Sequence, residues 1–498
     1  MQQPILGRLS QSMEALFCFI VPCILDDDQR IVEEDTFRFG LTDVMFIRTL
    51  AAVAIVPVKT RDLFKVDHSV YVQYIQKETS MQYGFLFERL RDELRALVLM
   101  AALLLLPSAA PAADSGFTQF IASLWPEAQA AGVSRATYDA ETRGLEPDYK
   151  LPDLILPGRP ATGAPSQAEF VQVPADYLKE ASIARLAAEG QRLMQKYRAS
   201  LEAIEARFGV PATIVLAIWG RETDYGRYTL PYDGLRVLAT QAYVGRRKDQ
   251  YRSEFILALK LLGDGEVTRK DMRASWAGAT GLTQFLPSES YKHGVDFDGD
   301  GRRDIWHSVP DALASAAQQL VNKGWQPGVR WAYEVRAPAN VDCTIGVPEV
   351  TKPIGEWLRQ GFVPVRGQQL SATEQAQPAS LLQPEGIYGP AFLTTKNYFV
   401  IKEYNFSDLY VLFVGHLSDR MLRPQPFATP WSASTQLRTA DVEAMQRHLT
   451  RIGLYKDKLD GKAGMQTRAA LGAYQKSAGL KVDCWPSEAV LRSISAPR

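Results

Sequence analysis

The sequence has few cysteines, and their spacing excludes two classes of small, cross-linked or metal-bound protein. The four cysteines are Cys18, Cys23, Cys343 and Cys484, and no two of them form a CxxC pair. A zinc site built on cysteine pairs and a dense disulfide framework are therefore both excluded. Cys343 and Cys484 could pair with each other in an oxidising compartment, a question that the sequence leaves open.

The chain also lacks an excess of charge of either sign. Lysine and arginine together number 56, aspartate and glutamate together also number 56, and the formal net charge is zero. This balance argues against nucleic acid or an acidic membrane surface as the main partner. The hydrophobic content of 46% is that of a globular protein, and 498 residues suffice for two or three domains.

The chain contains one clear targeting signal, and its apolar run is too short to span a membrane. Its apolar run, 96–106, is far shorter than the roughly 20 residues that a membrane-spanning helix needs. Three arginines precede this run and Ala110-Pro111-Ala112 follows it, so residues 85–112 have the order of a cleaved secretory signal peptide. No cysteine lies at the cleavage site, which argues against a lipoprotein. We therefore expect a periplasmic protein that does not span the membrane.

A signal peptide this far from Met1 is unusual, and residues 1–84 contain no repeat or motif. We expect translation to start nearer the signal, for example at Met81, and the residues upstream of that start to be foreign to the native protein. N-terminal sequencing of the exported protein tests this expectation. The sequence does not indicate an oligomeric state.

Apolar periodicity after the signal predicts a mainly α fold (α+β) with two folded parts. The chain between Trp325 and Tyr398 is irregular, with short strand-like pieces such as RWAYEVRA. Helices are expected at 117–143, 177–207, from Pro211 onward, and at 248–262, 310–323 and 407–421. The predicted domains are a catalytic domain at 113–422, a Pro-rich linker at 423–436 and a small helical domain at 437–498.

The stretch LAIWGRETDYG, residues 216–226, places Glu222 at the end of an apolar run. On the helix that Pro211 opens, Glu222 shares a face with Ile218 and Trp219, and with Val215 one turn further. An apolar wall disfavours the charged form of a carboxyl group, so we expect Glu222 to stay protonated near neutral pH. A general acid in glycoside cleavage needs this property. A solvated glutamate near a helix end is the alternative.

ETDYG is followed by SWAGATGLTQFLPS and then by VDFDGDGRRDIW. In order and spacing these motifs resemble the lytic murein transglycosylase B family, from about residue 115 to 422. The resemblance implies a lysozyme-like catalytic domain in which Glu222 is the single catalytic acid. It also implies that Ser275 and Gln284, together with Asn405 and Tyr410 from the later motif EYNFSDLYV, bind the glycan.

The sequence offers no clear second carboxylate for a hydrolase. Retaining and inverting glycosidases both use a pair, and Asp224, two residues from Glu222, is expected on another face of the helix. The resemblance implies instead that the muramoyl C6 hydroxyl attacks C1, assisted by the N-acetyl group, and leaves a 1,6-anhydromuramoyl end. The alternatives are a hydrolytic muramidase and a non-catalytic, Ca²⁺-dependent scaffold that binds the cell wall.

The segment DFDGDGRRD resembles the start of an EF-hand loop. Asp296, Asp298 and Asp300 occupy positions one, three and five, and the backbone carbonyl of Arg302 is offered at position seven. Position twelve is His307 rather than glutamate. The resemblance implies Asp311 as the closing ligand, although HSVPD carries one extra residue, and Asp304 is another candidate. We expect a structural Ca²⁺ site and no organic cofactor; a solvated Asp/Gly turn is the alternative.

The segment from Asp441 to Leu480 resembles a three-helix peptidoglycan-binding domain. Val442, Met445 and Leu449 form one helical face, and Thr467 is expected to cap a second helix that carries Leu471 and Tyr474. Such a domain would tether the enzyme to peptidoglycan glycan strands; a packed appendage without a binding role is the alternative. Most members of an aromatic group upstream are expected to be packing residues: Trp276, Tyr291, Trp306, Trp325 and Trp331.

Overall fold

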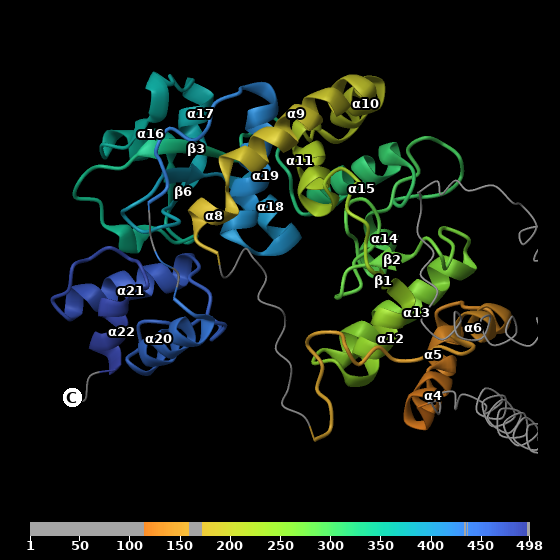
Figure 1. Ribbon diagram of the computed structural model, residues 1–498. Helices are drawn as coiled ribbons and strands as arrows, with labels where there is room; N and C mark the ends of the chain where they lie inside the picture. The colour runs from red at the N-terminus through yellow and green to blue at the C-terminus, as the bar shows by residue number, and fades with distance from the viewer. Residues whose placement is uncertain (1–113, 159–171, 433–434, 436, 496–498) are drawn as a thin grey trace, which may run out of the picture. The chain divides into compact units, whose positions relative to one another are not determined.

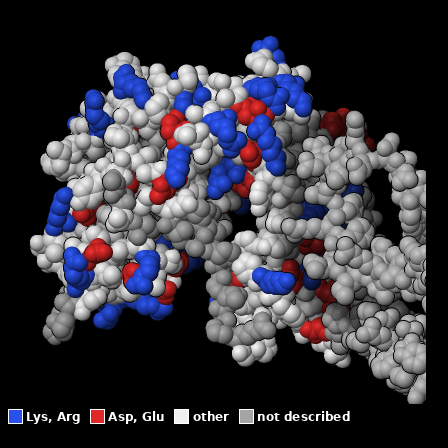
Figure 2. All heavy atoms as spheres, in the orientation of Figure 1, with Lys and Arg blue, Asp and Glu red and all other residues white. Residues whose placement is uncertain are grey.

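The computed structural model describes residues 114–158, 172–432, 435 and 437–495 (Figure 1). The upstream segment 1–84, the signal peptide 85–112 and residues 159–171 lie outside the described residues. Within the described part, no helix combines the length and the apolar character that crossing a membrane requires. On the face shown in Figure 2, acidic and basic side chains are interspersed over the described residues, as the balanced composition suggests.

Helix α11 (Ala212–Thr223) is the centre of the larger apolar core (Figure 1). Its sequence ATIVLAIWG is apolar on every side, so it is stable only when neighbours surround it. Pro211 precedes it, as predicted, and Val215, Leu216 and Ile218 are fully buried. The helices that pack around it are α9 (Glu180–Lys196), α10 (Arg198–Phe208), α15 (Val309–Asn322) and α19 (Asp408–Leu422).

A second core lies among α12 (Gly234–Val244), α13 (Lys248–Gly263) and α14 (Pro287–His293), and the three short helices that begin the described chain. One helix was predicted over 117–143, and this prediction is wrong. Gly132, with φ of 89°, and the N-cap Ser134 divide the segment. The helices are α4 (Ser115–Ser123), α5 (Trp125–Ala130) and α6 (Arg135–Thr142).

The predicted helix over 177–207 is likewise divided, because Tyr197 has non-helical backbone angles between α9 and α10. A single turn, α8 (Pro174–Tyr177), precedes α9. The predicted helices at 248–262, 310–323 and 407–421 are confirmed to within two residues.

The irregular region contains an antiparallel five-stranded sheet with the order β4-β6-β7-β3-β5. Its register pairs Ala332 with Thr394 and Thr351 with Ser380. Trp357 is fully buried against the sheet and donates its indole N–H to the carbonyl oxygen of Ala379. The elements are β3 (Ala332–Arg336), β4 (Thr351–Pro353), α16 (Ile354–Arg359), β5 (Val363–Pro364), α17 (Ala372–Ala376), β6 (Pro378–Leu382), β7 (Ala391–Thr394) and α18 (Lys396–Asn405).

Three helices form the C-terminal part: α20 (Thr439–Arg451), α21 (Met465–Ser477) and α22 (Glu488–Ser495). The predicted face of Val442, Met445 and Leu449 is fully buried. The capping role predicted for Thr467 is wrong, because α21 begins at Met465 after Gly464. Thr467 lies inside the first turn, buried, and its hydroxyl donates to the carbonyl oxygen of Lys462.

Cys343 and Cys484 form a disulfide, which answers the question that the sequence left open. Their Cα atoms are 6.1 Å apart across 141 positions of sequence. Cys343 belongs to the short helix η2 (Cys343–Ile345), and Cys484 precedes α22. The disulfide therefore joins the C-terminal helices covalently to the part of the chain that carries the sheet.

The described linker residues pack against the preceding domain. The ring of Phe427 stacks on His416 with centroids 3.8 Å apart, and the backbone N–H groups of Ala428 and Thr429 donate to Glu334. In this part of the linker, ring stacking and backbone hydrogen bonds hold the chain in place.

Candidate active site

Glu222 lies where α11 ends and the backbone turns sharply. Asp224 and Tyr225 both have positive φ angles, of 50° and 58°, which non-glycine residues adopt only where surrounding contacts hold them. One such contact is the hydroxyl of Thr223, which donates to the carbonyl oxygen of Leu282 at 2.8 Å. The turn brings the GLTQF loop beside the end of α11.

The carboxyl group of Glu222 is half-buried and contacts a buried phenol. The hydroxyl of Tyr410, in the first turn of α19, donates to Oε1 of Glu222 at 2.6 Å. Val215, Ile218 and Trp219 are buried, so the apolar wall predicted behind Glu222 is confirmed. The sequence indicated this wall but did not indicate that a phenol would touch the acid.

Tyr404 is a site residue that the sequence analysis missed. Its ring stacks on that of Tyr410 at 6.1 Å and an interplanar angle of 10°, and its hydroxyl donates to the carbonyl oxygen of Thr283 at 2.7 Å. Leu282 and Tyr404 pack against both apolar cores, so the site lies where the two cores meet. Tyr404 could have been identified in the sequence from its position in the motif EYNF, one residue before the predicted binding residue Asn405.

Both phenols remain protonated donors. Burial, and then the nearby charge of Glu222, raises the pKa of Tyr410 and that of Tyr404 well above the ordinary value for tyrosine. Because Tyr410 donates to Oε1, a protonated Glu222 would carry its own proton on Oε2. The pair can thus hold the acid in one orientation while leaving its proton for transfer.

The other predicted binding residues lie in loops and at a helix end. The hydroxyl of Ser275 accepts from the backbone N–H of Ala279, and the side chain of Gln284 donates to the carbonyl oxygen of Gly281. Gln284 follows Thr283, whose carbonyl oxygen accepts from the hydroxyl of Tyr404. Asn405 ends α18, and its side-chain Oδ1 is buried without a hydrogen-bond partner among the described residues. Tyr410, also predicted to bind the glycan, forms a direct hydrogen bond to Glu222.

Two open hollows share Tyr228 beside the acid. The hollow that contains Glu222 has a volume of about 340 Å³ and is also lined by Arg185, Arg221, Asp224 and Phe413. The second has a volume of about 170 Å³ and is lined by Thr223, Lys270, Leu282, Trp306 and His307, among others. Tyr228 is an exposed aromatic residue at their junction, a surface suited to a sugar ring.

Asp224 lines the same hollow as Glu222, which corrects the expectation that it lies on another face. The helix ends at Thr223, and the left-handed backbone of Asp224 redirects its side chain. The carboxylate of Asp224 forms an ion pair with Arg185, and Nη1 of Arg185 lies 2.9 Å from Oδ1 of Asp224. A second carboxylate is therefore present, but it is paired with a cation.

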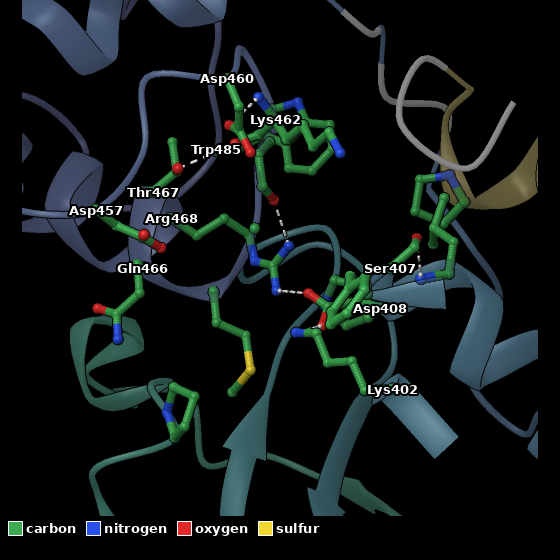
Figure 3. Close-up of a pocket in the computed structure, with 18 of the residues that line it drawn as sticks. Lys402, Ser407, Asp408, Asp457, Asp460, Lys462, Gln466, Thr467, Arg468 and Trp485 are labelled. Atoms are coloured by element: carbon green, nitrogen blue, oxygen red, sulfur yellow. Dashed lines mark hydrogen bonds and ion pairs between the residues drawn. The ribbon is translucent and has the colours of Figure 1, made fainter. Parts of the chain in front are cut away.

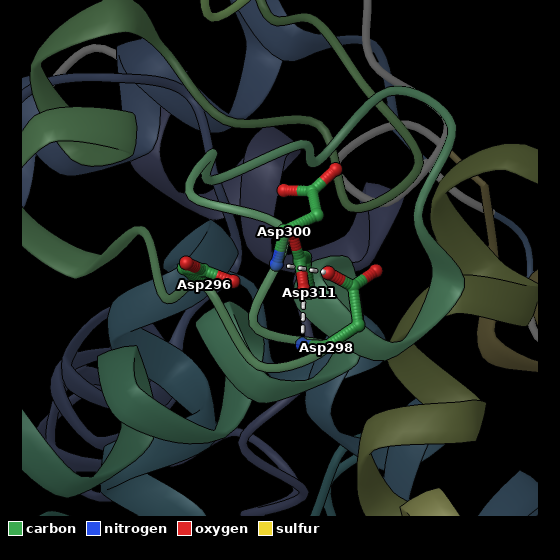
Figure 4. A group of neighbouring side chains, drawn as sticks. All are labelled: Asp296, Asp298, Asp300 and Asp311. Carbon is green, nitrogen blue, oxygen red and sulfur yellow. Dashed lines mark hydrogen bonds between the residues drawn. The ribbon is translucent and has the colours of Figure 1, made fainter.

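The acidic loop brings four carboxylates together (Figure 4). Ligand oxygens of Asp296, Asp298, Asp300 and Asp311 all lie within 4.8 Å of one another, so the extra residue in HSVPD does not displace Asp311. Asp304 instead accepts from the backbone N–H groups of Trp306 and His307.

Asp311 is buried at the start of α15 and accepts backbone N–H groups from Phe297, Asp298 and Asp304. Burial raises the pKa of Asp311, and the negative charge of Asp298 adds to this effect while the three donors oppose it. Convergent oxygens with mutual repulsion fit a divalent cation with oxygen ligands.

Residues 116–419 match the transglycosylase SLT domain family, and residues 438–494 match a family of peptidoglycan-binding domains. The chain belongs to the transglycosylase SLT domain family. Membrane-bound lytic murein transglycosylase B of Escherichia coli (strain K12) is 30% identical over 215 residues, a match that covers 42% of this chain and 56% of that relative. The resemblance to the lytic murein transglycosylase B family is thus confirmed.

Two crystal structures of SltB3 from Pseudomonas aeruginosa are similar to this SLT-family chain. The complex with NAG-anhNAM-pentapeptide has a TM-score of 0.70 at 36% identity, covering 77% of this chain and 100% of that one. The complex with NAG-NAM-pentapeptide has a TM-score of 0.68 at 35% identity, covering 76% and 100%. These similarities confirm the mainly helical, lysozyme-like fold with a C-terminal helical domain.

Proposed function

We propose that this chain is a peptidoglycan lytic transglycosylase that cleaves the β-1,4 bond between N-acetylmuramic acid and N-acetylglucosamine. The observation that carries the proposal is the Tyr410–Glu222 hydrogen bond, in an open hollow, in front of an apolar wall. Family membership and the similarity to SltB3, whose crystal complexes contain NAG-NAM and NAG-anhNAM pentapeptides, support this substrate.

In the proposed reaction, Glu222 gives its proton to the glycosidic oxygen as the C1–O4 bond breaks. The N-acetyl group of the muramoyl residue assists this departure. The ionised Glu222, stabilised by the hydroxyl of Tyr410, then takes the proton of the muramoyl C6 hydroxyl as O6 bonds to C1. One bond is broken and one is formed, no water is consumed, and the product has a 1,6-anhydromuramoyl end.

Several residues are proposed to hold the glycan during these steps. Asn405 offers an unpartnered buried acceptor, which suits an N–H or O–H donor of a sugar. Tyr410 would keep Glu222 aimed at the scissile bond. Gln284 belongs to the loop that the hydrogen bonds of Thr223 and Tyr404 hold in place, and Ser275 precedes that loop in the same motif.

We also propose a structural Ca²⁺ held by Asp296, Asp298, Asp300 and Asp311, with the backbone carbonyl of Arg302 as a further ligand. The ion would offset part of the negative charge of the cluster and fix the loop that precedes α15. It is assigned no part in bond cleavage.

For the domains we propose the predicted bounds: a catalytic domain at 113–422, a linker at 423–436 and a peptidoglycan-binding domain at 437–498. The match of residues 438–494 to peptidoglycan-binding domains supports the last of these. We propose that the protein resides in an oxidising compartment such as the periplasm. The Cys343–Cys484 disulfide supports this location, and the signal peptide at 85–112 would direct the chain to it.

A hydrolytic muramidase is the second candidate, because Asp224 shares the hollow with Glu222. Mass spectrometry of products from purified peptidoglycan distinguishes the two. An anhydro product is lighter than the hydrolytic product by one water, about 18 mass units. We expect the anhydro product from wild type and none from Glu222→Gln. Reducing-end products that disappear in Asp224→Asn would assign the muramidase, and wall binding without any product would assign the scaffold.

A further inference from the structure

The side chain of Asp408 lies in the first turn of α19, two residues before Tyr410, and accepts three hydrogen bonds. The hydroxyl of Tyr398 donates to Oδ1 at 2.6 Å. Nζ of Lys402 also donates to Oδ1 at 2.6 Å, and Nη2 of Arg468 donates to Oδ2 at 2.9 Å (Figure 3). Tyr398 and Lys402 belong to α18, whereas Arg468 belongs to α21 in the C-terminal part. A side chain from the peptidoglycan-binding domain therefore reaches the turn that carries Tyr410.

The Arg468–Asp408 ion pair is buried, with 8% and 7% of the two side chains exposed. Burial alone would raise the pKa of Asp408, but the cations of Lys402 and Arg468 outweigh it and hold the pKa below its ordinary value. Removal of one partner from a buried ion pair is strongly unfavourable. Without Arg468, Lys402 would be the remaining cation beside Asp408, and Oδ2 of Asp408 would lose the donor that Arg468 supplies.

An open hollow borders the first turn of α19 beside the ion pair. It has a volume of about 370 Å³ and is lined by α18–α19 residues such as Phe406 and Leu409 and by C-terminal residues such as Tyr455 and Met465. On this side of the turn, Tyr398, Lys402 and Arg468 hold the carboxylate of Asp408. Of these three, Arg468 is the one that comes from the C-terminal part.

Other contacts between the C-terminal helices and the rest of the chain determine the position of Arg468. The disulfide holds Cys484 to Cys343, and on α21 itself Nε2 of Gln466 donates to Glu349 at 2.8 Å. The carbonyl oxygen of Asp483 also accepts from the backbone N–H of Ile387. The C-terminal helices are thus docked through several contacts, and Arg468 is presented to Asp408 in one orientation.

We propose that Arg468 is a positioning residue for the catalytic acid: by holding Asp408 it fixes the first turn of α19 and aims the hydroxyl of Tyr410 at Glu222. The inference rests on the proposed function for its catalytic consequence. It gives the C-terminal domain a second role, in which it completes the support of the active site besides binding the wall. Displacement of a catalytic group by about 1 Å can lower a rate roughly 100-fold, so modest loosening of the turn is enough.

The test compares Arg468→Ala with Lys476→Ala, a matched change that breaks another contact between α21 and the rest of the chain. The substrate is a short, soluble glycan fragment of peptidoglycan, because its cleavage does not depend on tethering to the wall. We expect Arg468→Ala to lower kcat about tenfold with KM within about twofold, and Lys476→Ala to leave both within about twofold. Arg468→Lys retains the charge and should recover part of kcat.

A double-mutant cycle identifies the route of the effect. If Arg468 acts through Tyr410, Arg468→Ala should lower kcat by less than about twofold in a Tyr410→Phe background. A full tenfold loss in that background would overturn the proposal. So would a normal kcat on the soluble fragment combined with a loss on insoluble wall, which is the behaviour of a tether only.

Amide hydrogen exchange over residues 408–412 measures how firmly the first turn of α19 is held. This measurement tests the positioning role of Arg468 independently of the proposed function. Faster exchange in Arg468→Ala but not in Lys476→Ala supports the positioning role, even if wild type yields hydrolytic products or none. Unchanged exchange in Arg468→Ala overturns it. If Arg468→Ala does not fold, Arg468→Gln, which removes the charge, is measured in its place, and normal kcat with normal exchange in that variant would also overturn the proposal.

Discussion

The hydroxyl of Tyr410 donates to Oε1 of Glu222 at 2.6 Å, although 188 positions separate the two residues. The acid comes from a helix that is apolar on all sides, and the donor comes from the first turn of a helix packed against it. The acid is therefore oriented by a neutral group that cannot take its proton.

Tyr410→Phe is expected to lower kcat about 10- to 100-fold while KM changes little. The substitution removes the hydrogen bond that stabilises the ionised Glu222 after proton transfer, and it leaves the ring in place. Steady-state kinetics on a soluble glycan fragment measures this. Tyr197→Phe, which removes the hydroxyl of a ring that packs edge-on against Trp219, is the matched control and should keep wild-type kinetics. Equal losses in both variants would contradict the prediction.

Calcium is expected to raise the unfolding temperature, and a chelator to lower it. Binding at about 100 times Kd stabilises the folded state by about 2.7 kcal/mol, or roughly 3 °C for a chain of this size. Asp298→Ala removes one ligand from the cluster and should reduce the shift, whereas Asp249→Ala, in the first turn of α13, should not. A calcium-independent melting temperature in wild type would refute the site.

Reduction of the Cys343–Cys484 disulfide is expected to destabilise the protein by about 2–4 kcal/mol, because the bond closes a long loop in the unfolded chain. Urea unfolding with and without a phosphine reductant measures the difference. The double variant Cys343→Ser/Cys484→Ser is the control, since its stability should not respond to the reductant. If both proteins respond equally, the effect has another source.

Stability in acid is expected to depend on Asp408. Its pKa is lower in the folded state than in the unfolded chain, so its contribution is fully present above the ordinary value of 3.8 and diminishes as the pH falls further. Asp408→Asn should thus be less stable than wild type at pH 6, and the difference should shrink below about pH 4. Asp139→Asn, at an exposed ion pair, should show no such trend. Thermal unfolding across pH 2–7 provides the comparison.

Local patterns were sufficient for the features whose cause is local. Pro211 and the apolar run after it predicted α11, and the burial of Ile218 and Trp219 follows from helical spacing. The single helix over 117–143 failed because its apolar residues do recur at helical spacing, while Gly132 and Ser134 break the backbone. Thr467 was misassigned because glycine also begins helices and needs no side chain to do so.

Contacts between distant segments could not be predicted in the same way. The stacking of Tyr404 on Tyr410 and the ion pair of Arg468 with Asp408 depend on how separate helices meet. Asp224 was expected on another face because a regular helix was assumed to continue past Thr223. The pairing of Cys343 with Cys484 could not be predicted, because the spacing of two cysteines in the sequence does not show that they meet in the fold.

The Cys343–Cys484 disulfide spans the linker, so the two ends of any cut made there remain joined. A protease that cleaves between 423 and 436 would leave one particle that separates into two chains only after reduction. The segment within the loop includes α18 and α19, and with them Tyr404, Asn405 and Tyr410, whereas Glu222 lies outside it. A chain cut in the linker would therefore keep its C-terminal helices attached to the fragment that carries Glu222 and Tyr410.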